Sequence, residues 1–247
     1  MIKILLLLLP IYLFSLELQN NYDISFGIFG TLGKAKTYIN RDNKKYNIKV
    51  EAYAKGFAKF LSNYRKETYE SKGIVKGNLL YPLEYKKIKS TYSYTKIKKY
   101  IFDHENKKVT LEKNNFYKDT NETVTSKEEY KYYAQNDILS LYFNIINLIK
   151  DDTKDYFVFQ AVGAKEDNGR VEIIKPQNED LKEIKSLMEI DTDNFLRVKI
   201  NQDIFSSSEG EMIINIDKDN NCNKVILKDV LLFGDIIGNK INLFNKL

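Results

Sequence analysis

The amino-acid sequence predicts a mainly β fold in which a curved antiparallel sheet encloses one apolar helix. Apolar and polar residues alternate over most of the chain, which is typical of strands with one buried face. Polar turn residues separate these segments at short intervals. One run of residues is too apolar to face water, so the sheet must cover it. The 247 residues contain no linker-like stretch, and we therefore expect a single domain.

The expected strands follow one another along the whole chain. In the first half they span residues 22–39, 46–53, 64–74, 83–94, 97–102 and 109–117. In the second half they span residues 156–162, 170–174, 195–200, 211–216, 224–233 and 235–244. Turn-forming residues at 41–44 and 103–106 separate consecutive strands, and Asn114 and Asn115 are a further natural turn point. The polar stretch Lys118–Lys131 is the longest expected loop.

Residues 138–149 depart from this alternation and predict a helix. The run is apolar around most of its circumference, and Asn136 and Asp137 precede it as capping residues. At 1.5 Å per residue the run spans about 18 Å, which is too short to cross a bilayer. We therefore expect this helix to lie against the concave face of the sheet. Its candidate ligand-contacting residues are Ile138, Leu141, Tyr142, Ile145, Ile146 and Ile149.

A second helix is expected at residues 179–190, where apolar side chains recur on one stripe. Leu181, Ile184, Leu187 and Met188 form that stripe, and charged residues fill the remaining positions. This pattern suits an amphipathic helix on the surface. A mobile loop is the alternative, because an acidic segment ends the pattern abruptly.

The first residues have the features of a secretory leader. Lys3 gives a positive start, residues 4–14 form an apolar core, and Ser15 is a small residue at which cleavage is expected. An uncleaved anchor is the less favoured alternative, since a spanning helix needs about 20 apolar residues and polar ones follow at once. We therefore expect residues 1–15 to be a signal peptide. Residues 16–247 should form a single β-rich domain in the periplasm, outside the membrane after cleavage.

The residue types that most enzymes and metal sites require are scarce. His104 is the only histidine and Cys222 is the only cysteine. His104 lies in an expected surface turn, without a carboxylate placed to orient it. Cys222 has no disulfide partner in the chain and is expected to be buried rather than redox-active. Because no motif predicts a nucleophile, a zinc site or a nucleotide loop, we expect no enzymatic activity and no cofactor.

Two polar segments carry weaker signals. Asp217, Asp219 and Asn221 are spaced like the first ligands of a calcium loop, but the glycine and the distal glutamate of such a loop are missing. The same residues are preferred in hairpin turns, which is the favoured interpretation. Asn121 lies in an Asn-x-Thr triplet within the longest polar loop, with Asp119 two positions before it, and is a candidate glycosylation site.

Lysines and tyrosines interleave between residues 85 and 100. The lysines are Lys86, Lys87, Lys89, Lys96, Lys98 and Lys99, and the tyrosines are Tyr85, Tyr92, Tyr94 and Tyr100. One interpretation is a basic ledge for anionic envelope material. The favoured one is the solvated outer face of a hairpin, where lysines prevent edge-to-edge pairing. Arginine occurs only four times in the chain, so we expect no nucleic-acid partner.

The order of several short motifs resembles a known family. They are the run Phe26–Gly33, the segment Ser71–Ile74, the turn Leu80–Tyr85, the block Asn136–Phe143 and the closing segment Val230–Asp235. Together they are similar to an uncharacterised family of exported Gram-negative proteins, domain of unknown function 3108 (DUF3108). The resemblance covers nearly all of the chain after residue 15. It implies a half-barrel or rolled barrel similar to those of lipoprotein carriers, and it supplies no activity and no catalytic residues.

Two functions of different classes follow from these observations. In the first, the protein is a binding module whose curved sheet holds a hydrophobic or lipid-like ligand, with the 138–149 helix as its lid or plug. In the second, the helix completes a filled core that holds no ligand. The protein is then a structural or interaction component of cell-envelope assembly, with another envelope protein as its partner.

Overall fold

The computed structural model describes residues 16–27, 30–151, 153–164, 167–200, 210–217, 221–230 and 234–241. The expected signal peptide, residues 1–15, lies outside the described residues. The first half of the chain contains β1 (Leu16–Phe26), β2 (Thr31–Arg41), β3 (Lys45–Ala54), α1 (Gly56–Leu61), β4 (Lys66–Lys76), β5 (Leu79–Ser90), β6 (Tyr94–Asp103), β7 (Lys108–Tyr117) and β8 (Glu122–Glu129). The second half contains β9 (Asn136–Asp137), α2 (Ile138–Leu148), β10 (Tyr156–Val162), the short 3-10 helix η2 (Asp167–Gly169), β11 (Arg170–Ile174), α3 (Asn178–Met188), β12 (Phe195–Ile200), β13 (Glu211–Ile216), β14 (Cys222–Val230) and β15 (Gly234–Lys240).

The described strands form one open sheet. Their order is β8-β7-β6-β5-β4-β3-β2-β1-β15-β14-β13-β12-β11-β10-β9, and neighbours are antiparallel except for the parallel pair β9 and β10. β1 pairs with β2 on one side and with β15 on the other, so strands from both ends of the described chain meet in the middle of the sheet. The end strands β8 and β9 each pair with one neighbour. The sheet is therefore open, as in a half-barrel, and not closed into a rolled barrel.

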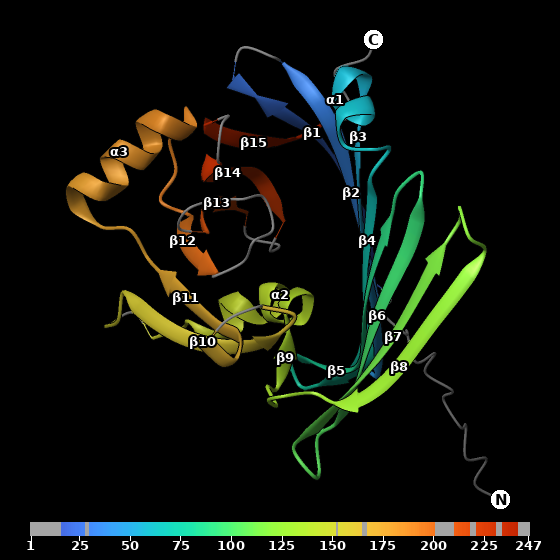
Figure 1. Ribbon diagram of the computed structural model, residues 1–247. Helices are drawn as coiled ribbons and strands as arrows, with labels where there is room; N and C mark the ends of the chain where they lie inside the picture. Colours follow the sequence, from blue (N-terminus) through green and yellow to red (C-terminus); the bar gives the residue numbers. More distant parts are fainter. Residues whose placement is uncertain are drawn as a thin grey trace, which may run out of the picture.

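The sheet bends around helix α2. Figure 1 shows one arm made of β2–β8 and a second arm made of β10–β14, with α2 lying between them. Helix α2 contacts β4 and β5 on the first arm and β9 and β10 on the second. The predicted fold class, a curved antiparallel sheet around one apolar helix, is confirmed.

The strand predictions are most accurate in the second half of the chain. There β10, β11, β12 and β13 have the bounds that the alternation predicts. In the first half, the long segment 22–39 is two strands, β1 and β2, and residues 114–115 lie inside β7 rather than at a turn. The turn at Asp42 is confirmed, since its Oδ1 accepts hydrogen bonds from the backbone N–H groups of Lys44 and Lys45 at 2.6 and 2.7 Å.

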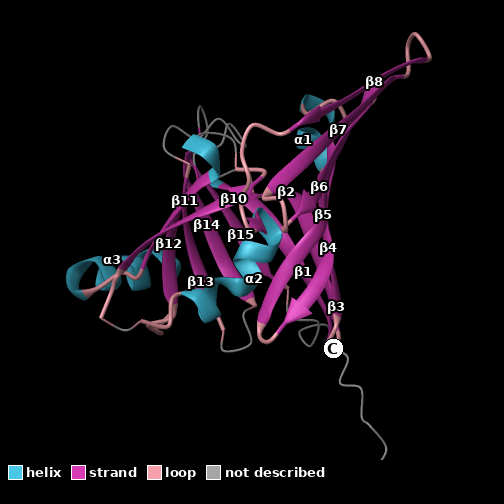
Figure 2. Cartoon of the chain, turned by 90° about the horizontal axis from the view of Figure 1, so that it is seen from below, coloured by secondary structure: helices cyan, strands magenta, loops and turns pink. Residues whose placement is uncertain are grey.

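The expected loop Lys118–Lys131 is wrong, because most of it is strand β8. All eight side chains of β8 are exposed, so neither face shows the apolar alternation that marks a strand in the sequence. Backbone pairing with β7 holds the strand, and ion pairs reinforce it, such as Lys113 Nζ to Glu128 Oε1 at 2.6 Å. Only residues 118–121 form a turn. In Figure 2 the β7–β8 hairpin extends well beyond the rest of the sheet.

Both predicted helices are present. Helix α2 lies within the sheet, and α3 is an ordered amphipathic helix rather than a loop. Ile184 and Met188 of α3 are buried and pack against Phe195, Ile213 and Ile226 of the sheet. Among the described residues, no helix is both long enough and apolar enough to cross a membrane.

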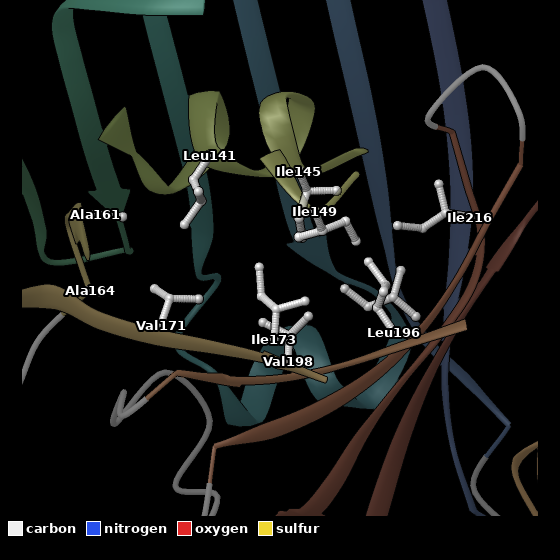
Figure 3. Packing of buried hydrophobic residues seen from close by; sticks show 11 residues of the cluster. Leu141, Ile145, Ile149, Ala161, Ala164, Val171, Ile173, Leu196, Val198 and Ile216 are labelled. Atoms are coloured by element: carbon white, nitrogen blue, oxygen red, sulfur yellow. The ribbon is translucent and has the colours of Figure 1, made fainter. Parts of the chain in front are cut away.

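The main apolar cluster joins α2 to the second arm. Figure 3 shows Leu141 and Ile145 of α2, with Ile149 just after it, lying opposite Val171 and Ile173 of β11. These five side chains are at most 5% exposed. The packing fixes α2 inside the concave side of the sheet, which is where the candidate site lies.

Candidate ligand-binding site

Asp137 fixes the start of α2. Its Oδ1 accepts hydrogen bonds from the backbone N–H groups of Leu139 and Ser140 at 2.8 and 2.9 Å, and the Ser140 hydroxyl accepts one from the Asp137 N–H at 3.0 Å. This is a capping box, which satisfies donors that a helix start leaves unpaired. The Asp137 Oδ2 accepts a hydrogen bond from the hydroxyl of Ser71 in β4 at 2.6 Å. The carboxyl group is buried, and burial raises its pKa to about 6 despite these bonds.

Asn144 fastens the middle of α2 to β5. Its Oδ1 accepts a hydrogen bond from the N–H of Leu80 at 2.8 Å, and its Nδ2 donates to the carbonyl of Leu80 at 2.9 Å. Pairing between β5 and β6 begins only at Glu84, so Leu80 lies beyond the end of β6. The Asn144 amide therefore takes the place of a strand neighbour for Leu80. The same Nδ2 also donates to Asn136 Oδ1 at 2.8 Å.

An apolar cavity lies between α2 and the two arms of the sheet. Its volume is about 370 Å³, which is within the usual size range of small-molecule sites. Side chains from β1, β2 and β3 form one wall, side chains from β11–β15 form the other, and α2 contributes the rest. The apolar wall residues include Ala35 and Val50 on the first arm and Val198 and Ile214 on the second.

The few polar groups of the cavity wall are bonded to one another. Asn20 Nδ2 donates to Asn221 Oδ1 at 3.1 Å, and the Tyr22 hydroxyl donates to the carbonyl of Cys222 at 2.9 Å. Burial raises the pKa of the Cys222 thiol to about 12 and also raises the pKa values of Tyr22 and Tyr142. These groups are therefore protonated at neutral pH. The arrangement can hold an apolar chain, but it presents no anionic nucleophile.

Four of the six predicted ligand-contacting residues line the cavity. They are Ile138, Leu141, Tyr142 and Ile145. Ile146 does not line it, and its side chain is 42% exposed. Ile149 does not line it either, since it is 5% exposed and packs in the adjoining apolar cluster.

The sheet side of the cavity was not predicted from the sequence. Its residues, such as Tyr22, Thr37 and Val225, come from strands far apart in the chain. Alternation indicates which residues of a strand share a face, but it does not indicate which strands pair. The β1–β15 pairing that joins these residues links positions more than 200 apart, for example Tyr22 and Lys240. Cys222, expected to be buried, is half-buried because it forms part of the cavity wall.

The interleaved lysines and tyrosines lie on both faces of the sheet. Tyr85 and Tyr100 are 1% and 5% exposed and belong to an apolar cluster on the concave side, so the prediction of a wholly solvated outer face is wrong. Side chains two apart in a strand share a face. Lys87 and Lys89 of β5 therefore share the face of Tyr85, and Lys96 and Lys98 of β6 share the face of Tyr100. We call these four residues the inner lysine patch.

His104 links β5 to the segment that follows β8. Its Nε2 donates a hydrogen bond to the carbonyl of Pro82 at 2.6 Å, and the Tyr133 hydroxyl lies 2.8 Å from its Nδ1. The ring stacks on Phe102 with centroids 5.6 Å apart. The predicted surface histidine is thus partly buried, with both ring nitrogens engaged in structural contacts.

The residues of the calcium hypothesis form a turn where they are described. Asp217 Oδ1 accepts hydrogen bonds from the backbone N–H of Asn221 at 2.9 Å and from its amide at 3.2 Å. Asp219 lies outside the described residues. Within the part of the chain that is described, no group of three or more His, Cys, Asp or Glu residues could hold a metal ion.

The candidate glycosylation residue Asn121 is exposed at the tip of the β7–β8 hairpin. Its φ of 56° is the left-handed conformation that asparagine tolerates in turns. An exposed turn is accessible to a modifying enzyme, and glycosylation at this position stays a prediction.

Comparison with known protein families gives the same family that the order of motifs in the sequence resembles. No curated protein and no solved structure matches the chain. A family model described as "Protein of unknown function (DUF3108)" matches residues 21–239. This span runs from the middle of β1 to the penultimate residue of β15 and includes every residue of α2. The chain therefore belongs to the DUF3108 family.

Proposed function

We propose that this protein is an exported, non-enzymatic binding protein that holds a hydrophobic or lipid-like ligand in the cavity beside α2. The observation that carries the proposal is the apolar cavity of about 370 Å³ between the helix and both arms of the sheet. A wall of aliphatic side chains offers no hydrogen bonds to water, and such cavities favour apolar guests.

The chemistry of the cavity wall supports binding over catalysis. A nucleophile needs a lowered pKa or a neighbouring base, whereas burial raises the pKa of Cys222. The amides of Asn20 and Asn221 are bonded to each other and are not free to polarise a substrate. These features are typical of a protein that binds a ligand without changing it chemically.

Export to the periplasm is part of the same proposal. Its support lies in the sequence, where Lys3, the apolar core at 4–14 and Ser15 form a secretory leader. A carrier or holder of lipid-like molecules is useful in such a compartment, where free apolar chains are insoluble.

The test is to identify what the native protein carries. Protein purified from its own envelope without detergent is analysed by native mass spectrometry, and the bound molecules are then extracted and identified. We expect a reproducible apolar ligand at one copy per chain. A ligand-free protein that also fails to bind added fatty acid would contradict the proposal and favour the alternative, a structural component of envelope assembly.

A cavity-filling variant makes this test specific. Ala35 lines the cavity, and Ala35→Phe places a large ring in the space that the ligand occupies. We expect this variant to lose most of the bound ligand while it keeps its thermal stability, because the cavity has room for the ring. Lys36→Phe is the matched control, since the next residue of β2 is exposed and points away from the cavity. An equal loss of ligand in both variants would refute the assignment of the cavity.

A further inference from the structure

The turn between β7 and β8 carries the Asn-x-Thr triplet of the chain. Asn121 is followed two positions later by Thr123, and no other asparagine of the sequence is followed by Ser or Thr at that distance. Asp119 lies two positions before Asn121, where the extended acceptor of bacterial oligosaccharyltransferases has an acidic residue. The triplet alone is a weak signal. Its exposure and its freedom to open therefore decide whether a transferase can use it.

Every residue of this acceptor segment, 119–123, is exposed. Asp119, Thr120 and Asn121 belong to the turn, and Glu122 and Thr123 are the first two residues of β8. The turn is the tip of the hairpin that extends beyond the rest of the sheet (Figure 2). A bulky sugar on Asn121 would therefore lie in solvent and would displace no packed side chain.

The side-chain amide of Asn121 is not used by the fold. Within the described part of the chain it has no hydrogen-bond partner, whereas Asn106 in the β6–β7 turn donates from Nδ2 to Asp103 Oδ2 at 2.7 Å. The left-handed φ of 56° gives a structural reason for asparagine at position 121. It gives no reason for the hydroxyl of Thr123, which lies in β8. The Nδ2 atom of Asn121 is thus free to react.

The start of β8 can leave the sheet at little cost. β8 is an edge strand that pairs with β7 alone. Its ion pairs, as far as the strand's described contacts go, are made by Lys127, Glu128 and Glu129 at the end away from the turn. The β7 side of the turn is held more firmly, since the Lys118 N–H donates to the carbonyl of Ser93 at 2.9 Å. Strand ends without buried side chains open locally with small free energies. The acceptor segment can therefore enter an enzyme while the core stays folded.

We propose that Asn121 is an N-glycosylation site, modified after export by an oligosaccharyltransferase of the bacterium that makes the protein. This inference rests on the export in the proposed function and is independent of the apolar cavity. It explains why an acidic residue, an asparagine and a threonine occur at acceptor spacing at the most accessible turn of the sheet. The sugar would also cover the open edge that β8 leaves beside the turn.

The co-reactant is an oligosaccharide carried on a lipid diphosphate. Nδ2 of Asn121 attacks the anomeric carbon of the first sugar. A carbon–nitrogen bond forms, the carbon–oxygen bond to the diphosphate breaks, and Nδ2 gives up one proton. The lipid diphosphate leaves with the electron pair of the broken bond, so the transfer needs no oxidant and no reductant.

The test is the intact mass of the protein isolated from the envelope of its own cells. We expect the mass of a chain without residues 1–15 plus one oligosaccharide, and fragmentation of the peptide that contains position 121 should place the sugar on Asn121. The Asn121→Gln variant, expressed from the same gene locus, should lose the whole added mass. Circular dichroism should show the same thermal unfolding for both proteins, because the residue is exposed.

Matched variants separate recognition of the triplet from a general effect on the hairpin. Thr123→Val removes the acceptor hydroxyl and should abolish the added mass, whereas Thr123→Ser retains the hydroxyl and should keep it. Thr125→Val is the control, because Thr125 is exposed on the same face of β8 but lies outside the triplet. It should keep the sugar. Asp119→Asn should reduce the glycosylated fraction, and Asp119→Glu should restore it.

The outcomes also separate this inference from the proposed function. A processed wild-type chain without a sugar would overturn the inference and leave the proposed function standing. A chain that keeps residues 1–15 and has no sugar would overturn both the export and the glycosylation. A sugar that survives Asn121→Gln, or one that Thr125→Val removes as fully as Thr123→Val does, would overturn the assignment to this triplet.

Discussion

The buried carboxyl group of Asp137 predicts an unusual dependence of stability on pH. Its pKa is raised from 3.8 to about 6 in the fold. Because the folded state holds this proton more tightly than the unfolded chain, protonation favours folding. The contribution is fully present below about pH 4 and is lost as the pH rises through 6. A shift of about 2 units corresponds to about 3 kcal/mol.

The perturbation is Asp137→Asn, which removes the charge and keeps the cap. Asparagine caps helices as well as aspartate does, so its Oδ1 can still accept from Leu139 and Ser140. The Ser71 hydroxyl lies 3.0 Å from that of Tyr46, where either oxygen can donate, so Ser71 can turn to accept from the new amide. The free energy of unfolding of the variant, relative to wild type, should therefore rise by about 3 kcal/mol between pH 4 and pH 7.

The assay is urea unfolding at pH 4, 5, 6 and 7, followed by circular dichroism. Ionisations elsewhere occur in both proteins and cancel in the difference. Asp42→Asn is the control, because backbone hydrogen bonds from Lys45 and Lys44 lower the pKa of Asp42 below its usual value of 3.8, so its difference should stay nearly constant between pH 4 and pH 7. A difference for Asp137→Asn that stays constant from pH 4 to pH 7 would refute the reasoning, since it would mean that burial does not shift this carboxyl group.

Two further predictions concern buried polar groups. Asn144→Ala removes three hydrogen bonds and leaves both backbone groups of Leu80 unpaired. We therefore expect urea unfolding to show a loss of about 2–4 kcal/mol in the free energy of unfolding. The control Asn147→Ala, on the more exposed side of α2, should cost less than about 1 kcal/mol. Equal losses would contradict the role of Asn144. The Tyr85 hydroxyl is one of the few buried side-chain groups in the described residues that have no hydrogen-bond partner. Tyr85→Phe should therefore leave stability unchanged or raise it by about 1 kcal/mol. A loss above about 1 kcal/mol in thermal or urea unfolding would reveal a partner.

The sequence predicts those elements in which local residues decide the structure. Helix α2 follows from its apolar circumference and from Asp137, whose capping contacts all lie within three residues. Strand β8 could not be predicted in the same way, because ETVTSKEE has two exposed faces and owes its conformation to β7. The inner position of Lys87 and Lys89 follows from their even spacing to Tyr85, but only once Tyr85 is known to be buried.

The cavity could not be predicted from the sequence, for a different reason. Four α2 residues were predicted to face a ligand and do line the cavity, because a helix places i and i+3 or i+4 on one side. The same spacing placed Ile146 with Tyr142, four residues before it, but Ile146 is 42% exposed and does not line the cavity. The opposite walls come from two arms whose pairing is set by long-range contacts, and alternation carries no information on those.

The pairing of β1 with β15 has a consequence for how the chain folds. Each arm is built mainly from strands that are neighbours in the chain, so the contacts within an arm can form early. The two arms are joined by the pairing of β1 with β15, which are the first and the last described strands. Contacts of such long sequence separation form late and slowly. Until β15 has been synthesised, the edge of β1 has open backbone groups that can pair with another chain. Chains that stop before Gly234 should therefore aggregate, and the intact sheet can be completed only after synthesis of nearly the whole polypeptide.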